Sequence, residues 1–321
     1  MKILVTEPEF YSSASLLRLE NLGEVFCSDI NTNAELDREL KVRKYDVVFA
    51  KLGLEFDTTF FMQHPEIRYL ATPTTGLTHI NLQVCEARKV TIISLKDEID
   101  FLESITTTAE HIWFLLLSLA RQNARVQKII AAGKWCRQGL SITQLSGKNL
   151  GIIGYGRLGE IVSSYGDAFR MNVHVYDKKD LSECNVPDKY QVMENLASLL
   201  TESDFIVLTA SFLGEKILDN ENINSIKHGA CLINASRGEL VDEDQIIRAL
   251  DSGLLSGYAT DVLNGDSSWD SSEKVSSPVF EKAKTDERVF ITPHIGGYAI
   301  DAIQSTRNYL VELVLGKLAS Q

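Results

Sequence analysis

Apolar and polar positions follow two successive patterns along the chain, in which short β-branched runs alternate with amphipathic stretches. The first series predicts strands at residues 2–6, 24–28, 46–50, 68–72 and 91–95; the second predicts strands at residues 149–156, 171–177, 204–210, 230–236, 256–262 and 288–294. Strands that alternate with helices are typical of parallel sheets joined by crossover helices. We therefore expect an α/β protein with two doubly wound parallel-sheet domains.

Two long helical patterns mark the places where the chain crosses between these domains. One covers residues 103–132 and the other covers residues 296–319, where apolar positions recur at helical spacing. We expect a substrate-binding domain at residues 1–97, completed by the C-terminal helix at 297–321, and a nucleotide-binding domain at residues 98–296. Ligand sites tend to lie between domains, so we expect the active cleft there.

Composition and charge narrow the class of partner. The 321 residues carry a net charge of −12, which disfavours nucleic acid but leaves room for a small anionic substrate in a local positive pocket. The five cysteines are scattered and form no C-x-x-C pair, which indicates reduced thiols and no zinc site. The longest apolar run, residues 112–120, is too short to span a bilayer. With no signal peptide at its start, the sequence favours a cytoplasmic protein with no metal site.

The strongest motif is the stretch GIIGYGRLGE, in which Gly154, Gly156 and Gly159 form G-x-G-x-x-G. It follows an apolar strand and opens a helical run, and the next strand ends in Asp177, as the dinucleotide fingerprint requires. The glycines allow a tight turn, a close approach of backbone to the pyrophosphate and close helix packing. Asp177 is placed to accept hydrogen bonds from ribose hydroxyls and to repel a 2′-phosphate, which favours NAD over NADP. Lys178 and Lys179 weaken that preference.

Two further stretches carry chemistry at predicted strand ends. Arg237 follows one strand in CLINASRGEL, and His294 follows another in VFITPHIGG. A guanidinium can hold a carboxylate or keto oxygen by paired hydrogen bonds, and an imidazole can exchange a hydroxyl proton near neutral pH. Facing a nicotinamide, the two suit hydride transfer on a 2-hydroxy or 2-keto acid. His111, on the long helix, is interpreted as a packing residue.

The motifs GIIGYGRLGE, INASRGELVDEDQIIRALDSGLLSGYATDVL and TPHIGG resemble those of the D-isomer-specific 2-hydroxyacid dehydrogenases. TTTAEHIWFLLLSLAR is similar to the interdomain helix of that family, so the resemblance covers most of the chain. It implies a Rossmann dinucleotide-binding domain inserted in a flavodoxin-like substrate domain, and an NAD-dependent oxidoreductase that acts on a small D-2-hydroxy or 2-keto acid.

The resemblance also implies roles for individual residues. Arg237 is expected to bind the substrate carboxylate and carbonyl, His294 to be the general acid/base, and Asp261 to contact the nicotinamide carboxamide. The implied cofactor-binding residues are Gly154, Gly156, Arg157, Leu158, Gly159, Asp177, Thr209, Ala210, Ser211, Ala235, Ser236, Asp261, His294 and Gly296. The implied substrate-binding residues are Lys51, Thr75, Gly76 and Arg237.

The family's third catalytic residue is a glutamate that pairs with the histidine, and here the sequence departs from the pattern. Asp266 stands at that position, and Ser267 replaces the proline that usually follows. Asp266 is the first candidate because of its position. Since aspartate is one methylene shorter than glutamate and reaches less far, Asp270 and Glu273 in the same serine-rich stretch are alternatives. A chain in which no acid pairs with His294 would be slow or inactive.

The sequence says less about the identity of the substrate and about the oligomeric state. Residues Lys51-Leu52-Gly53 lack the arginines of a phosphate-binding loop, which disfavours 3-phosphoglycerate. The apolar segment from Ile112 to Lys134 would suit a homodimer, although a buried interdomain helix would look the same. An alternative function is an NAD(H)-binding regulatory or interaction module of the same fold with weak or no turnover.

Overall fold

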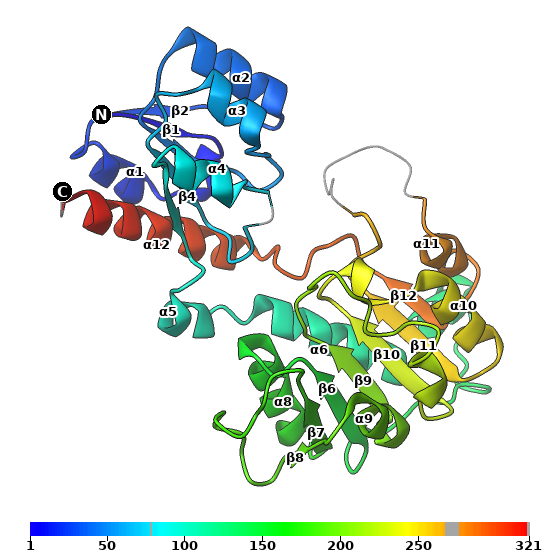
Figure 1. Ribbon diagram of the computed structural model, residues 1–321. Coiled ribbons are helices and arrows are strands. Elements are labelled where there is room, and N and C mark those ends of the chain that lie inside the picture. The colour runs from blue at the N-terminus through cyan, green and yellow to red at the C-terminus, as the bar shows by residue number, and fades with distance from the viewer. Residues whose placement is uncertain (78, 267–275, 320–321) are drawn as a thin grey trace. The chain divides into compact units, whose positions relative to one another are not determined.

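The computed structural model describes residues 1–77, 79–266 and 276–319. These residues form two compact units, one from Met1–Ile105 with Tyr298–Gln321 and the other from Thr106–Gly297 (Figure 1). The expected domain boundaries, at 97/98 and 296/297, lie slightly earlier along the chain. Helix α5 (Ile99–Glu103) belongs to the first unit because Phe101 stacks on Tyr309 and the Tyr309 hydroxyl donates a hydrogen bond to Glu98.

The first unit is a five-stranded parallel sheet in the order β2-β1-β3-β4-β5, the flavodoxin-like order. Its strands are β1 (Lys2–Val5), β2 (Glu24–Cys27), β3 (Val47–Phe49), β4 (Tyr69–Thr72) and β5 (Thr91–Ser94). One face packs on α2 (Asn33–Val42), α3 (Thr58–Gln63) and α4 (Leu82–Ala87); the other packs on α1 (Ser13–Leu19) and α12 (Ile300–Ala319). Both faces are covered, and the central strands β3 and β4 are therefore buried along their whole length, as in parallel sheets packed on both sides.

The C-terminal helix α12 is held to the first unit by a buried ion pair as well as by packing. Leu310, Val311 and Val314 are fully buried against the sheet. Arg307 donates from Nε to Glu7 Oε1 at 2.8 Å, and both side chains are almost excluded from solvent. Burial raises the pKa of the Glu7 carboxyl although Arg307 opposes the shift. A charge pair of this kind ties the two ends of the chain together, since removal of either partner leaves a buried charge uncompensated.

The second unit is a seven-stranded parallel sheet in the order β12-β11-β10-β9-β6-β7-β8, which contains the Rossmann strand order. Its strands are β6 (Asn149–Ile153), β7 (Asn172–Tyr176), β8 (Gln191–Val192), β9 (Phe205–Leu208), β10 (Ala230–Asn234), β11 (Leu255–Thr260) and β12 (Val289–Ile291). The order reverses between β6 and β9, and dinucleotides bind at such a point. The predicted fold class, two parallel α/β sheets with a Rossmann unit, is confirmed.

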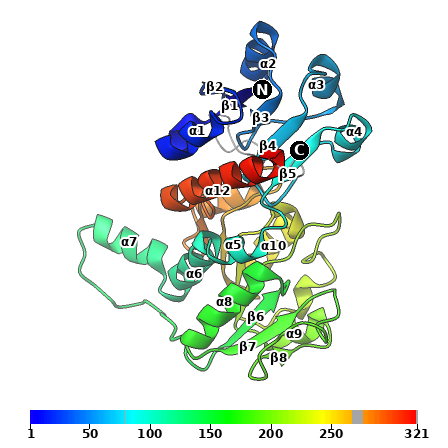
Figure 2. The same cartoon turned by 90° about the vertical axis from the view of Figure 1, so that its left-hand side faces the viewer.

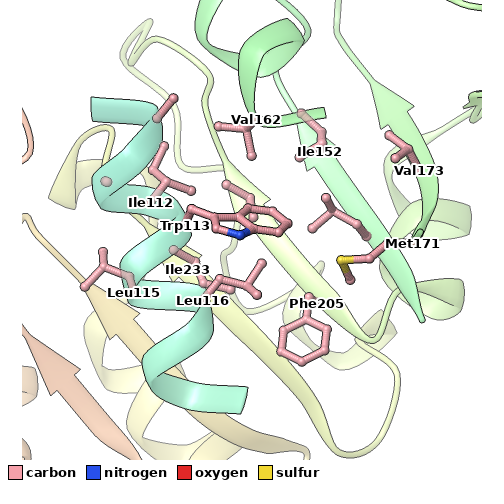
Figure 3. Close-up of a cluster of buried hydrophobic side chains, with 14 of the residues drawn as sticks. Ile112, Trp113, Leu115, Leu116, Ile152, Val162, Met171, Val173, Phe205 and Ile233 are labelled. Atoms are coloured by element: carbon pink, nitrogen blue, oxygen red, sulfur yellow. The ribbon is translucent and has the colours of Figure 1, made fainter. Parts of the chain in front are cut away.

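Helices cover both faces of this second sheet (Figure 2). Helices α6 (Thr107–Ala120) and α8 (Arg157–Ala168) cover one face, and α9 (Leu196–Glu202), α10 (Glu243–Asp251) and α11 (Pro278–Ala283) cover the other. Trp113 on α6 packs close to Ile152 of β6 and Val162 of α8, the two elements that the glycine turn connects (Figure 3). The core therefore lies directly beneath the glycine motif.

The long helix predicted at residues 103–132 is two helices. Helix α6 ends at Ala120, and α7 (Asn123–Ala131) starts after Gln122, which adopts a left-handed conformation with φ of 51°. The loop that follows α7 returns to this break: Thr143 N donates to Ala120 O at 2.8 Å, and Ser141 N donates to Gln122 Oε1 at 3.1 Å. These bonds stabilise the break, because Ala120 O, which a continuous helix would pair with Ala124 N–H, accepts a bond from the loop instead.

Candidate active site

The glycine motif forms a tight turn between β6 and α8. Gly154 has φ of 99°, and a Cβ there would lie 2.4 Å from the backbone N of Ala210 at the end of β9. A Cβ on Gly159 would lie 2.3 Å from Gly154 O. Both positions therefore exclude any larger residue because the backbone is in the way. A Cβ on Gly156 would meet no protein atom within 4 Å, so the space beside this glycine is open.

The open space at Gly156 coincides with the start of α8. Gly156 is the N-cap of this 12-residue helix, and no side chain caps it. Arg157 and Leu158, in the first turn, are partly exposed. An uncapped helix N-terminus offers backbone N–H groups and a positive dipole end to an anion. This geometry fits the pyrophosphate of a dinucleotide.

Asp177, which follows β7, stabilises the glycine loop through a hydrogen bond to its backbone. Its Oδ2 accepts the Tyr155 N–H at 2.8 Å, and its Oδ1 accepts the Lys179 N–H at 2.9 Å. Each carboxylate oxygen keeps a further lone pair, so the side chain can still accept from a ribose hydroxyl. Lys178 pairs with Glu215 at 2.8 Å, which directs its charge toward another side chain.

The remaining predicted cofactor residues lie along the same carboxyl edge of the sheet. Thr209, after β9, donates from its hydroxyl to Gly154 O at 2.7 Å, and Ser236, after β10, donates to Leu208 O at 3.0 Å. The hydroxyls thus link neighbouring strand ends. Ala210 is partly exposed, Ser211 is exposed and Ala235 is nearly buried.

Arg237 stands at the start of the turn after β10, and a hydrogen bond from a buried side chain holds its backbone in place. The fully buried Asn234 donates from Nδ2 to Arg237 O at 2.9 Å, while the guanidinium is exposed and donates to Ser236 O. The next residue, Gly238, packs against the segment after β11, where a Cβ would lie 2.1 Å from the carbonyl carbon of Leu263. This close approach joins the Arg237 turn to the segment that carries Asp266.

Asp266 pairs with His294. Its Oδ2 lies 3.0 Å from His294 Nδ1 and also accepts the Leu263 N–H at 3.1 Å. Both side chains are about four-fifths buried, at 23% and 21% exposed. The shorter aspartate therefore reaches the imidazole. A hydrogen bond at Nδ1 orients the ring, as a general acid/base requires. The alternatives Asp270 and Glu273 lie outside the described residues.

His294 itself has an unusual backbone conformation. Its φ is 54°, in the left-handed region that residues with a Cβ seldom adopt. Its N–H donates to Asp261 O at 2.9 Å and to Thr292 O at 3.0 Å. Such a conformation persists where surrounding bonds over-determine it, and it is often found at functional sites.

Asp261 is more deeply engaged within the chain than the sequence suggested. Its Oδ1 accepts the Thr292 hydroxyl at 2.6 Å and the Ile295 N–H at 2.9 Å, and its Oδ2 accepts the Gly296 N–H at 2.7 Å. Burial would raise the pKa of this carboxyl, but the hydrogen bonds outweigh burial and hold the pKa below its usual range. Asp261 is therefore a buried, ionised carboxylate that holds the His294 segment.

Two residues in this unit were not predicted as part of the site. His111, interpreted as a packing residue, lies 2.9 Å from Thr292 Oγ1 and 3.2 Å from Asp261 Oδ1. Glu243 accepts the Asn264 N–H and the Ser277 hydroxyl at 3.0 and 2.8 Å, on either side of the stretch that follows Asp266. For His111 the available signal was a polar residue next to the apolar run of residues 112–117, since a buried polar group needs a hydrogen-bonding partner.

Three of the four predicted substrate-binding residues lie in the first unit, at the carboxyl edge of its sheet. Lys51 follows β3, where its N–H donates to Thr6 Oγ1 at 2.8 Å and its ammonium contacts Asn31. Thr75 and Gly76 follow the neighbouring strand β4 and are exposed. The structure thus gathers these three residues at one edge, and gathers Arg237, Asp266 and His294 at an edge of the other sheet.

A parallel sheet with a dinucleotide turn and an Asp–His pair at its carboxyl edge defines an NAD-binding α/β protein of the dehydrogenase class. The family model of the D-isomer specific 2-hydroxyacid dehydrogenase NAD-binding domain matches residues 113–296. The chain therefore belongs to this family, as its motifs indicated, and NAD as the cofactor is confirmed.

Individual relatives agree with this assignment. The glyoxylate reductase of Pyrococcus furiosus is 27% identical over 289 residues, which cover 87% of this chain and 80% of that protein. A D-isomer specific 2-hydroxyacid dehydrogenase from Polaromonas superposes with a TM-score of 0.84 at 22% identity, over 100% of this chain and 97% of its own. The D-lactate dehydrogenase of Aquifex aeolicus, solved with NAD and lactic acid, gives 0.81 at 22% identity, over 100% and 96%.

The described part of the chain offers neither a candidate metal cluster nor a membrane-spanning helix. No group of three or more His, Cys, Asp or Glu residues in that part of the chain is placed to hold a metal ion. Within the same ranges, no helix is both long and apolar enough to cross a membrane.

Replacing Gly156 by alanine is expected to weaken NADH binding by about tenfold or more, or about 1.4 kcal/mol. The new methyl group enters the space beside the α8 N-terminus, where it meets no protein atom. Stability should fall by no more than about 1 kcal/mol, the cost of alanine at an N-cap. Fluorescence titration with NADH and thermal unfolding measure the two effects. Unchanged NADH affinity in a folded Gly156→Ala protein would show that the pyrophosphate does not bind beside Gly156.

Proposed function

We propose that the protein catalyses hydride transfer between NAD(H) and a small 2-hydroxy or 2-keto acid of the D series. The observation that carries this proposal is the hydrogen bond between Asp266 Oδ2 and His294 Nδ1, at the carboxyl edge of the NAD-binding sheet. Arg237 follows β10, Asp261 and Asp266 follow β11, and His294 follows β12, so these groups come from three adjacent strands. Ligands of open α/β sheets bind at this edge.

Each residue has a distinct task in the proposed reaction. When bound, NADH supplies the hydride that reduces the keto carbon, and NAD⁺ accepts it in the reverse direction. Arg237 holds the substrate carboxylate by charge-assisted hydrogen bonds, which orient the carbonyl. His294 donates a proton from Nε2 to the carbonyl oxygen during reduction and takes it back during oxidation. Asp266 keeps the imidazole oriented and stabilises its charged form.

The geometry of the second unit supports a proposed set of cofactor contacts. Gly154, Gly156, Arg157, Leu158 and Gly159 would cradle the pyrophosphate, with Asp177 on the adenosine ribose. The strand-end residues Thr209, Ala210, Ser211, Ala235 and Ser236 would line the remainder, and His294 and Gly296 would lie by the nicotinamide. Asp261 would act there through the lone pairs that its internal bonds leave. The pairing of Lys178 with Glu215 supports a preference for NAD over NADP.

Lys51, Thr75 and Gly76 are the proposed substrate contacts in the first unit. The exposed backbone of Thr75 and Gly76 offers N–H donors to an anionic group, and Lys51 offers one positive charge. Glyoxylate reductases are among the relatives, which supports a small 2-keto acid. We infer a cytoplasmic location from the five cysteines, all of which are free thiols.

Replacing Asp266 by asparagine is expected to lower kcat by about 10–100-fold, because the imidazole loses the negative partner that orients it. NADH affinity should stay within a few-fold. Asp270→Asn and Glu273→Gln are the matched controls, because each removes a carboxylate from the same acidic stretch, and both should retain the wild-type kcat. Loss of turnover in a control but not in Asp266→Asn would reassign the partner of His294.

We also propose that the protein is a homodimer in solution. Helix α6 buries its apolar face in the core of its own unit, but no residue of α7 is buried. Trp135 is 96% exposed, and Ile130 and Ile142 are about half exposed, so an apolar surface remains for a second copy. Light scattering should give the mass of two chains, and Trp135→Ser should shift the equilibrium toward one. The mass of a single chain for the wild-type protein at micromolar concentration would contradict the proposal.

A further inference from the structure

This unit has a second histidine–aspartate contact, between His111 and Asp261, in addition to the one between His294 and Asp266. His111 comes from the first half of α6, and its Nε2 lies 2.9 Å from Thr292 Oγ1 and 3.2 Å from Asp261 Oδ1. The His111 and Asp261 side chains are 11% and 2% exposed, so water scarcely competes for these contacts. A polar group at such depth needs its partners, because an unpaired one costs about 1–3 kcal/mol.

The hydrogens in this network can be assigned by counting donors. The Thr292 hydroxyl has one proton and donates it to Asp261 Oδ1 at 2.6 Å, so toward His111 it can only accept. The ionised carboxylate also only accepts. Both neighbours of His111 Nε2 therefore require an N–H at that nitrogen. His111 is the donor that points at Thr292 and Asp261 together.

Asp261 in turn accepts three hydrogen bonds from the backbone of the His294 segment. Its main-chain O accepts the His294 N–H, its Oδ1 accepts the Ile295 N–H, and its Oδ2 accepts the Gly296 N–H, at 2.9, 2.9 and 2.7 Å. A Cβ on Gly296 would lie 2.9 Å from Asp261 Oδ2, so the segment and the carboxylate are in close contact. These bonds oppose the cost of the left-handed conformation at His294, about 1–2 kcal/mol for a residue with a Cβ.

We propose that His111 is a positioning residue for His294, acting through Thr292 and Asp261. Its Nε2–H fixes the rotation of the Asp261 carboxylate, and the carboxylate fixes the turn that presents the His294 imidazole. Without this donor the carboxylate can rotate, and the bonds to Ile295 and Gly296 weaken. The consequence for catalysis rests on the function proposed above for His294; the consequence for the backbone does not.

Two substitutions separate the hydrogen bond from packing. His111→Leu fills a similar space without a donor, whereas His111→Gln keeps an N–H at nearly the same reach. Phe114→Leu is the matched control, because Phe114 lies one turn further along α6, with its ring centroid 5.7 Å from that of His111, and has no polar atom in its side chain.

The first measurement is amide hydrogen exchange at Ile295 and Gly296 by NMR in the full chain, which needs no substrate. We expect exchange about tenfold faster in His111→Leu, as expected for the loss of one hydrogen bond. Exchange in His111→Gln and Phe114→Leu should stay close to the wild-type rate. Unchanged exchange in His111→Leu, or equal acceleration in the leucine and glutamine variants, would overturn the proposal.

The second measurement is steady-state kinetics of the same variants. His111→Leu should lower kcat by about 10–100-fold while KM and NADH affinity stay within a few-fold, since misplacement of an acid/base by about 1 Å costs up to 10²-fold. His111→Gln should restore most of the rate. A rise in KM with unchanged kcat would contradict positioning of His294.

The two proposals fail in different ways. Faster exchange in His111→Leu, together with no turnover in any form including the wild type, would refute the enzyme and leave His111 as the residue that holds the segment. If His111→Leu does not fold, Thr292→Val removes the middle of the same network and should also accelerate exchange at Ile295 and Gly296. Wild-type exchange in that variant would overturn the proposal.

Discussion

Replacement of His294 by asparagine is expected to lower kcat by about 10²–10⁴-fold, the range that a general acid/base contributes. The variant loses the group that moves the proton at the substrate oxygen. Asparagine is the informative substitute because His294 has φ of 54°, and asparagine adopts this left-handed conformation more readily than most residues. The backbone bonds of the segment should therefore survive, and any loss of rate reports on the imidazole.

The control measurement for this variant is its affinity for NADH. NADH affinity in His294→Asn, measured by fluorescence titration, should stay within a few-fold of the wild-type value, because the glycine turn and Asp177 belong to other strand ends. A wild-type rate in His294→Asn would show that another group transfers the proton. A large loss of NADH affinity would indicate that the residue serves the cofactor before the substrate.

Replacement of Arg237 by glutamine is expected to lower kcat/KM by about 10³-fold, through loss of charge-assisted hydrogen bonds of about 1.5–3 kcal/mol each. The effect should fall on KM as well as kcat, because the guanidinium both binds the carboxylate and orients the carbonyl. Arg237→Lys should recover only part of the loss, since an ammonium cannot reproduce the planar fork.

The matched control is Arg248→Lys, on the exposed side of α10, which should leave both kinetic parameters unchanged. A wild-type kcat/KM in Arg237→Lys would show that a single positive charge is enough to bind the substrate carboxylate. Bidentate binding by the guanidinium would then be contradicted. Unchanged kcat/KM in Arg237→Gln would remove the arginine from the substrate site.

Much of the fold could be predicted because buried parallel strands leave a strong pattern. Runs such as residues 46–50 and 204–210 are apolar on both faces, and only a sheet covered by helices on both sides uses such strands. The break between α6 and α7 could not be predicted, because it is held by bonds from a later loop: Ser141 donates to Gln122, and Thr143 donates to Ala120. Strand β8 has two residues, too few to form a pattern.

The site was predictable where local geometry demands a particular residue and less so where distant segments meet. Gly154 follows from the turn itself. The pairing of Asp266 with His294 depends on Gly238 and Glu243, which set where the segment after β11 runs, so the sequence left three carboxylates as candidates. His111 looked like a packing residue because its partners come from strands far along the chain.

The central claim, hydride transfer to a small 2-keto acid, is tested most directly by following NADH oxidation at 340 nm with a panel of 2-keto acids. The panel should include glyoxylate, hydroxypyruvate, pyruvate and longer homologues, with chiral analysis of the products. We expect turnover on at least one member, with D stereochemistry wherever the product is chiral. NADH binding without turnover on any member would contradict the proposal and favour an NAD(H)-binding regulatory or interaction module.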